Sequence, residues 1–334
     1  MYNIVFYDTK NYEQDFFEQE LFDEYSLVFK DYPLNDNVDL TYQEEKADVI
    51  SIFTGSRLDV EILKKFKNLK LIITRSVGFS HIDVDYCSKK GIIVTNAPSY
   101  GDYTVAEFSF ALLLNLIRRI CFGQAELKIG EMYPETFGVE LYGKTIGIVG
   151  TGAIGSKSVK IAKGYSMNVI CYDICHNLEI EEKYQVKYTS LDTLCKLSDI
   201  IMLHAPLNTH SYHMFDREKI ALLKDNAIIV NTARGELIDT EALYDALLEN
   251  KIKGAALDVL EFEDTLSNKR PGENLDLRNL RTSLINSKLM QLPNVIVTPH
   301  MAYDTFEAIQ RILNKTLETI REYSDGSSLK YRVN

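Results

Sequence analysis

The amino-acid sequence predicts an α/β protein built from two doubly wound parallel sheets, and three observations support this fold class. Short apolar runs rich in β-branched residues alternate with segments of helical periodicity along the chain, the order that produces parallel sheets covered by helices. The runs form two series, which are separated by one long apolar helical segment. The chain has 334 residues, whereas a single hydrophobic core stops growing at about 250–300 residues. We therefore expect two domains, each with its own sheet.

Each series is a set of expected buried strands. Because near-continuous apolar runs are typical of strands covered on both faces, both sheets should be parallel. The first series comprises Asn3–Asp8, Ala47–Thr54, Leu69–Ser76 and Gly91–Pro98. The second comprises Thr145–Gly150, Asn168–Asp173, Asp199–Pro206, Ala227–Ala233, Gly254–Val259 and Asn294–His300.

Two helical segments define the expected domain boundaries. Asp102–Arg119 is apolar around most of its circumference, so we expect it to be buried on more than one side, between domains or against another subunit. Asp304–Tyr323 is amphipathic and has no strand partner of its own, which predicts that the chain returns to the first domain. The predicted domains are residues 1–100 with 300–334, and residues 101–299.

The charge of the chain limits its partners. The formal net charge is -11, and the lysines and arginines are scattered, so the surface should repel phosphate backbones and anionic membranes. No nucleic acid and no membrane partner is expected. The longest apolar stretch, Phe108–Leu114, is far shorter than the ~20 residues of a membrane span. An anionic small substrate remains open, because one arginine in a desolvated cleft outweighs a screened surface charge.

The N-terminus and the cysteines favour a cytoplasmic location. Met1–Lys10 lacks the basic head and apolar run of a signal peptide and resembles a first strand. The chain has 5 cysteines, an odd number that fits a reduced protein better than a disulfide framework. Cys171, Cys175 and His176 suggest a metal cluster, but Cys171 lies inside an apolar strand and the rest of a tetrahedral ligand set is missing. No metal is predicted.

A glycine-rich turn is the first candidate binding site. It follows the expected strand ending at Val149 and opens a helical segment. Asp173 ends the next strand, about 20 residues onward, where a dinucleotide-binding fold places the acid that accepts from the ribose. The helix N-terminus would supply N–H donors and a positive dipole to a pyrophosphate, and Asp173 would repel a 2'-phosphate, which predicts NAD. The alternative is a purely structural turn, and strand, helix and acid together favour the cofactor. The turn comprises Gly150, Gly152, Ala153, Ile154 and Gly155.

Three ionisable residues follow strand ends of the second series, where ligands sit in open α/β sheets. Arg234 would bind a carboxylate through two parallel hydrogen bonds. His300 would exchange a proton near neutral pH, and Glu263 would favour its charged form. Singly, each has an ordinary alternative as a loop, acidic-run or turn residue, and their joint placement at one sheet edge favours a catalytic set.

Further strand-end residues are expected to line the cofactor cleft. Asp258 would accept from the nicotinamide carboxamide, with a turn cap as the alternative. His204 precedes Ala-Pro in a turn beside the cofactor rather than in the chemistry, and Pro206, Thr232 and Ala233 complete the predicted cofactor-binding residues.

These motifs together resemble the D-specific 2-hydroxyacid dehydrogenase family over essentially the whole chain. Within that family the chain is most similar to the D-lactate dehydrogenase branch, which includes the enzymes of vancomycin-resistance operons. Two stretches, Asp258–Asp264 and the polar segment Thr265–Gln291, resemble that branch more than the glycerate and phosphoglycerate dehydrogenases. The matching stretches are Thr74–Asp83, Val105–Glu107, Leu141–Gly155, Asn231–Asp239, Ala255–Asp264 and Asn294–Thr305.

The resemblance implies a Rossmann NAD-binding domain and a flavodoxin-like substrate domain, with Arg234 orienting the substrate carboxylate, His300 as acid and base, and Glu263 raising the pKa of His300. It also implies a homodimer with the helix around 102–119 in the interface. Backbone donors at Val77 and Gly78 and pocket tyrosines at Tyr100 and Tyr303 are carried over as substrate-binding residues.

The chain departs from the family pattern at two places. Ser80 replaces the usual aspartate, which is expected to loosen a local turn. Gly101, Asp102 and Tyr103 replace the commoner Ser-Pro sequence, and this change should alter the hinge or the pocket rim.

The predicted activity is NADH-dependent reduction of a small 2-oxo acid, pyruvate or similar, to the (R)-2-hydroxy acid. The alternatives are a dehydrogenase for bulkier branched or aromatic 2-oxo acids, a hydroxypyruvate, phosphite or formate dehydrogenase, and a non-catalytic NAD(H)-sensing protein. The sequence identifies the charged head of the substrate and leaves its tail open.

Overall fold

The computed structural model describes residues 2–130, 137–263 and 277–334, and the chain divides into two compact units. The first unit is Met1–Tyr100 with Thr305–Asn334, and the second is Gly101–Asp304. Residues 300–304 are expected in the first unit from the sequence. They belong to the second because the amide of Ala302 donates to the Asp258 carboxylate at 2.8 Å.

The first unit contains a five-stranded sheet of order β2-β1-β3-β4-β5, in which every pairing is parallel. This is the strand order of flavodoxin-like folds. All four predicted runs are strands, and the edge strand β2 was not predicted. The strands are β1 (Asn3–Phe6), β2 (Ser26–Phe29), β3 (Val49–Ile52), β4 (Leu71–Thr74) and β5 (Ile93–Thr95).

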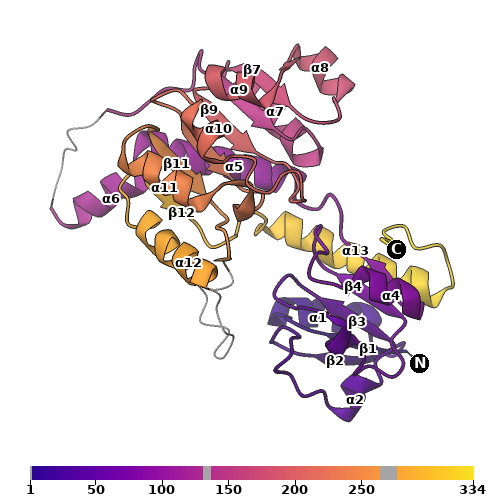
Figure 1. Ribbon diagram of the computed structural model, residues 1–334. Coiled ribbons are helices and arrows are strands. Elements are labelled where there is room, and N and C mark those ends of the chain that lie inside the picture. Colours follow the sequence, from indigo (N-terminus) through magenta and orange to yellow (C-terminus); the bar gives the residue numbers. More distant parts are fainter. Residues whose placement is uncertain (1, 131–136, 264–276) are drawn as a thin grey trace. The chain divides into compact units, whose positions relative to one another are not determined.

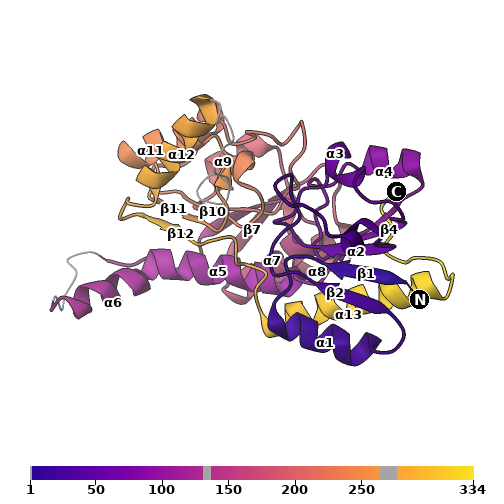
Figure 2. The ribbon, with the colours of Figure 1, turned by 90° about the horizontal axis from the view of Figure 1, so that it is seen from below.

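Helices cover both faces of this sheet. In Figures 1 and 2 the yellow α13 runs beside the indigo α1, and their apolar side chains share one core cluster, with Phe17 from α1 and Leu313 from α13. Ile62 of α3 and Cys87 of α4 pack into a second cluster. The predicted C-terminal helix is α13, whose N-cap Thr305 accepts from the amide of Ala308 at 3.2 Å. The helices are α1 (Asn11–Leu21), α2 (Tyr42–Glu45), α3 (Val60–Leu63), α4 (Val84–Lys90) and α13 (Phe306–Ser324).

The second unit contains a seven-stranded parallel sheet of order β12-β11-β10-β9-β6-β7-β8. Its first strand, β6, lies between β7 and β9, so the order reverses there, as in dinucleotide-binding sheets. All six predicted runs are strands, and β8 was not predicted. The strands are β6 (Thr145–Val149), β7 (Asn168–Tyr172), β8 (Lys187–Tyr188), β9 (Ile200–Leu203), β10 (Ile228–Asn231), β11 (Gly254–Leu257) and β12 (Val295–Val297).

Two helical layers enclose the second sheet. Helices α5, α7 and α8 bury Leu113, Val159 and Ile180 in one core cluster. Helices α9 to α12 contribute to the other, for example Leu194 and Leu289. The helices are α5 (Asp102–Arg118), α6 (Ile120–Lys128), α7 (Ala153–Gly164), α8 (Leu178–Tyr184), α9 (Leu191–Leu197), α10 (Arg217–Ala221), α11 (Thr240–Leu248) and α12 (Leu277–Leu289), with a short 3-10 turn η1 at Gly235–Leu237.

The predicted apolar helix is α5, which begins after its N-cap Gly101 and ends at Arg118. Arg119 takes a left-handed conformation with φ 55°, and α6 begins at the next residue. Eight residues of α5 are buried, and among them Leu113 and Ile117 pack into a core cluster of the second unit. None of the residues of α6 is buried. The sequence pattern thus located α5 and did not anticipate its continuation.

The structure also bears on the expectations about membrane spans, cysteines and metal ligands. None of the described helices is long and apolar enough to cross a bilayer. All cysteines are free, and Cys171 is buried inside β7. Among the residues that the structure describes, no group of three His, Cys, Asp or Glu side chains is arranged to hold a metal. Of the polar segment Thr265–Gln291, residues 265–276 lie outside the described residues.

Candidate active site

The glycine turn after β6 fits a dinucleotide phosphate. Gly150 has a φ of +88°, and a Cβ on Gly155 would stand 1.9 Å from the carbonyl oxygen of Gly150, so this position tolerates only glycine. Gly152 is the N-cap of α7, and a Cβ there would meet no atom within 4 Å. The N-terminus of a 12-residue helix is therefore open, with its N–H groups and positive dipole exposed to an anion.

Asp173 directly follows β7 and holds this turn in place. Its Oδ2 accepts from the amide of Thr151 at 2.6 Å and from the Thr151 hydroxyl at 3.0 Å, and Oδ1 accepts from the amide of Cys175 at 3.0 Å. Burial raises the pKa of the Asp173 carboxyl, but these hydrogen bonds together outweigh it and hold the pKa below its usual value. The lowered pKa keeps the carboxylate charged, and both its bond to the ribose hydroxyls and its repulsion of a 2'-phosphate remain predictions.

His204, after the end of β9, also supports the turn. A Cβ on Gly150 would lie 2.7 Å from the carbonyl carbon of His204, so the two backbones touch. The imidazole Nε2 is 2.8 Å from the Ser158 hydroxyl of α7. Burial lowers the pKa of His204 to about 3, which keeps the ring neutral. This geometry agrees with a residue that shapes the cleft.

The remaining predicted cofactor residues lie at strand ends of the same sheet. Pro206 lies three residues beyond β9, and Thr232 and Ala233 directly follow β10. The Thr232 hydroxyl is 2.7 Å from that of Ser109 on α5. Their contact with a cofactor remains a prediction.

His300 and Glu263 form a close pair. His300 Nδ1 lies 2.5 Å from Glu263 Oε1, and the backbone of His300 is left-handed, with φ 52°. Burial alone would lower the pKa of His300, but the hydrogen bond and the charge of Glu263 outweigh it, so the pKa is raised. Because Nδ1 is engaged, Nε2 is the nitrogen left to exchange a proton with a ligand.

Asp258 holds the turn that carries His300. The residue is 1% exposed, and its carboxylate accepts from the Thr298 hydroxyl at 2.5 Å and from the amides of Met301 and Ala302 at 3.0 and 2.8 Å. Burial raises the pKa of Asp258 above its usual value despite these bonds. The geometry is that of a turn cap, one of the two roles the sequence suggested, and the carboxamide contact remains a prediction.

Arg234 follows β10 and meets the loop that carries Glu263. Its Nη1 donates to the carbonyl of Ala233 at 2.6 Å, and its charge acts on His300, whose pKa it lowers in part. A Cβ on Gly235 would lie 2.1 Å from the carbonyl carbon of Leu260. The backbone contact at Gly235 therefore brings Arg234 into one cluster with Glu263 and His300.

The other predicted substrate residues are distributed over both units. Val77 and Gly78 follow β4 in the first unit, and Val77 is 47% exposed. Tyr100 is buried there, and its carbonyl accepts from Arg311 at 2.7 Å. Tyr303 belongs to the second unit. The roles of these four residues in substrate binding remain predictions.

Glu261 is a residue that the sequence did not single out. It was one of a run of acids with Glu263, yet it is 3% exposed. The available signal was its position directly after Val259 and Leu260, an apolar continuation of the buried β11.

Comparisons with known proteins identify the family of this chain. Residues 110–302 match the family model described as "D-isomer specific 2-hydroxyacid dehydrogenase, NAD binding domain". The D-lactate dehydrogenase of Aquifex aeolicus, solved in complex with NAD and lactic acid, superposes with a TM-score of 0.87 at 38% identity and covers 97% of this chain and 96% of its own.

Two curated relatives carry other substrate names. An aromatic 2-oxoacid reductase of Clostridium sporogenes is 38% identical over 291 residues, 86% of each chain. A D-3-phosphoglycerate dehydrogenase of Methanocaldococcus jannaschii is 41% identical over 290 residues, 86% of this chain, but the match spans about half of that protein's length, 52%.

Proposed function

This chain belongs to the D-isomer specific 2-hydroxyacid dehydrogenase family, and from that premise we propose that it reduces a small 2-oxo acid, pyruvate or similar, to the (R)-2-hydroxy acid with NADH. The family membership makes it an NAD-dependent oxidoreductase. The observation that carries the finer proposal is the 2.5 Å pair between His300 and Glu263 beside Arg234.

The proposed proton donor is His300. Reduction of a carbonyl places negative charge on its oxygen, which a positioned acid neutralises. Glu263 holds Nδ1, so the raised pKa of His300 keeps a proton available at Nε2. Bound NADH supplies the hydride. Formate oxidation has no carbonyl oxygen to protonate, so the pair favours a 2-oxo acid over that alternative.

Arg234 is the proposed carboxylate ligand. Its contact with the Ala233 carbonyl restricts the direction of the guanidinium. The planar group still has further N–H donors, which match a carboxylate in a bidentate arrangement. A substrate held there would present its C2 carbonyl toward the neighbouring histidine, an orientation that accounts for the 2-oxo acid head.

A bulkier substrate is the second candidate, because a relative at 38% identity is named an aromatic 2-oxoacid reductase. Initial rates with pyruvate, 2-oxoisocaproate and phenylpyruvate, each with NADH, decide between them. The highest kcat/KM with pyruvate supports the small acid, and the highest value with phenylpyruvate supports the aromatic one. NADH binding without turnover of any 2-oxo acid would instead indicate an NAD(H)-sensing protein.

We also propose a cytoplasmic homodimer. Ile120 and Leu127 of α6 and the following Ile129 are 59%, 61% and 79% exposed, an apolar surface that burial in a second copy would remove from water. Light scattering after size exclusion measures the mass, and a 38.2 kDa particle would contradict the dimer.

Replacing Arg234 by Lys should raise KM for the 2-oxo acid by about 10- to 100-fold, since one charge-assisted hydrogen bond of the bidentate set is lost. Steady-state kinetics measure the change. The Kd for NADH, obtained by fluorescence titration, serves as the control and should stay at the wild-type value. An unchanged KM would remove Arg234 from the carboxylate site.

Replacing Glu263 by Gln should move the loss of reductase activity to lower pH. The wild-type pKa of His300 is raised by Glu263, and reduction requires the protonated ring, so activity disappears as pH rises through that pKa. Without the carboxylate charge the ring loses its proton earlier. A pH profile of kcat identical to that of the wild type would rule out this role.

A further inference from the structure

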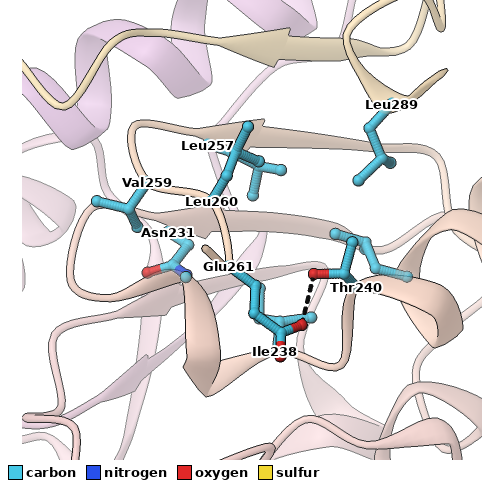
Figure 3. A pocket seen from close by; sticks show the side chains of 10 residues that line it. Asn231, Ile238, Thr240, Leu257, Val259, Leu260, Glu261 and Leu289 are labelled. Atoms are coloured by element: carbon cyan, nitrogen blue, oxygen red, sulfur yellow. Dashed lines mark hydrogen bonds between the residues drawn. The ribbon is translucent and has the colours of Figure 1, made fainter. Parts of the chain in front are cut away.

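A second carboxylate-histidine pair, Glu261 with His213, lies next to the Glu263–His300 pair in the sequence, two residues before Glu263. Oε1 of Glu261 is 3.0 Å from Nε2 of His213 and 3.3 Å from the hydroxyl of Tyr212. Oε2 accepts from the hydroxyl of Thr240 at 2.9 Å, the dashed contact in Figure 3. Glu261 is 3% exposed, so its carboxyl group is buried and hydrogen-bonded, and nothing in the proposed reaction uses it.

The backbone of Glu261 is held as well. Its carbonyl accepts from the amide nitrogen of Asn286 at 2.8 Å, and Asn286 is fully buried. A Cβ on Gly235 would lie 2.2 Å from the amide nitrogen of Glu261. The turn therefore has three fixed points: a carboxylate, a carbonyl and a backbone contact with the residue after Arg234.

The cluster is not a second ligand site. The cavity beside it, lined by Glu261, Thr240 and Asn231 among others, holds about 10 Å³. A water molecule requires roughly that much space. The buried carboxylate thus faces protein donors and at most one water. Any role of Glu261 must therefore come from the backbone turn whose position it fixes.

The same turn carries Glu263, the partner of His300. Glu263 is two residues beyond Glu261, and its Oε2 accepts from the amide of Leu260 at 3.3 Å while its Oε1 meets His300. Movement of the turn would therefore carry the Glu263 carboxylate away from the imidazole.

We propose that Glu261 is a positioning residue: from its buried site it fixes the turn from Leu260 to Glu263, so that the Glu263 carboxylate stays on His300. The inference rests on the proposed function only in assigning His300 to proton transfer. Two other titratable groups lie near Glu261 and its partner His213, namely Glu236 and Asp239. Those that face His300 besides Glu263 are Arg234 and Asp258.

A pair of Thr240 variants tests the anchor without removing the carboxylate. Thr240→Val keeps the shape and loses the hydroxyl, whereas Thr240→Ser keeps the hydroxyl. The NMR titration of the His300 ring should give a lower pKa in Thr240→Val and in Glu261→Gln, as in Glu263→Gln, and a pKa near the wild-type value in Thr240→Ser. The His300 resonance is assigned by its loss in His300→Asn.

The kinetic readout is the pH profile of kcat. In Thr240→Val and Glu261→Gln the high-pH limb should move to lower pH and kcat should fall about tenfold, as for other residues that orient a reacting side chain. The matched control is Glu44→Gln. Glu44 is fully buried and accepts from the Tyr7 hydroxyl at 3.1 Å in the first unit, so this variant should lower Tm and leave the limb in place.

Two results overturn the inference. One is a lowered Tm in Thr240→Val and Glu261→Gln together with an unchanged pKa of His300. That result would limit Glu261 to a role in stability. The other is the same shift in Thr240→Ser as in Thr240→Val. Absence of turnover in the wild type would refute the proposed function alone, because the NMR titration of His300 still decides the positioning role.

Discussion

Replacement of His300 by Asn should lower kcat for 2-oxo acid reduction by about 10²–10⁴-fold, the usual contribution of a positioned general acid. Asparagine is the appropriate substitute because position 300 is left-handed, with φ 52°, a conformation that asparagine tolerates better than most residues. Its amide cannot give up a proton at neutral pH, so the charge that develops on the carbonyl oxygen is no longer neutralised.

Steady-state rates measure this loss, and the binding of NADH measures its specificity. The Kd for NADH should change little, since the glycine turn is built from α7 and β6 and not from the segment after β12. The remaining activity should also lose the high-pH limb that the imidazole produces. A variant that retains a wild-type kcat and pH profile would exclude His300 as the acid.

Gly155→Ala should have the second large effect, on folding as well as on cofactor binding. A Cβ at this position would stand 1.9 Å from the Gly150 oxygen and 2.9 Å from its carbonyl carbon, and backbone atoms cannot turn aside as a side chain does. Overpacking of this kind costs about 1–3 kcal/mol or more of unfolding free energy. Tm should fall, and NADH affinity should fall with it, because the turn must open to accept the methyl group.

The matched variant is Gly152→Ala in the same turn. A Cβ there meets no protein atom within 4 Å, so Tm should remain near the wild-type value, while the methyl group occupies the space through which a pyrophosphate approaches the helix. Thermal unfolding and fluorescence titration separate the two effects. Unaltered NADH affinity in Gly152→Ala would place the phosphates elsewhere.

The sequence predicted every strand except β2 and β8, which lie at sheet edges. Every predicted run is a strand, because continuous apolar residues leave few other ways to be buried. The edge strand β2 is only half buried, and β8 consists of Lys187 and Tyr188. β2 has three apolar residues, Leu27, Val28 and Phe29, but spans only four positions, and β8 spans two. Such short strands depend for their pairing on a neighbouring strand that local sequence cannot show.

The proposed catalytic residues were predictable by type and the supporting contacts were not. Arg234, Glu263 and His300 are chemically conspicuous at strand ends, and the structure pairs the last two. The role of Asp258 depends on amides at residues 301 and 302, more than 40 positions along the chain. Glu261 differs from Glu263 only in burial, which depends on partners such as His213 from a distant segment.

The approach of Gly235 to Leu260 has a consequence for how this protein can change over evolutionary time. A residue at the rim of a pocket can drift through intermediate side chains, each altering substrate preference a little. Position 235 has no such path, because even one added carbon would overlap the backbone at 2.1 Å. New substrate preferences should therefore arise by substitutions elsewhere, while the approach of the Arg234 segment to the Glu263 turn is inherited unchanged.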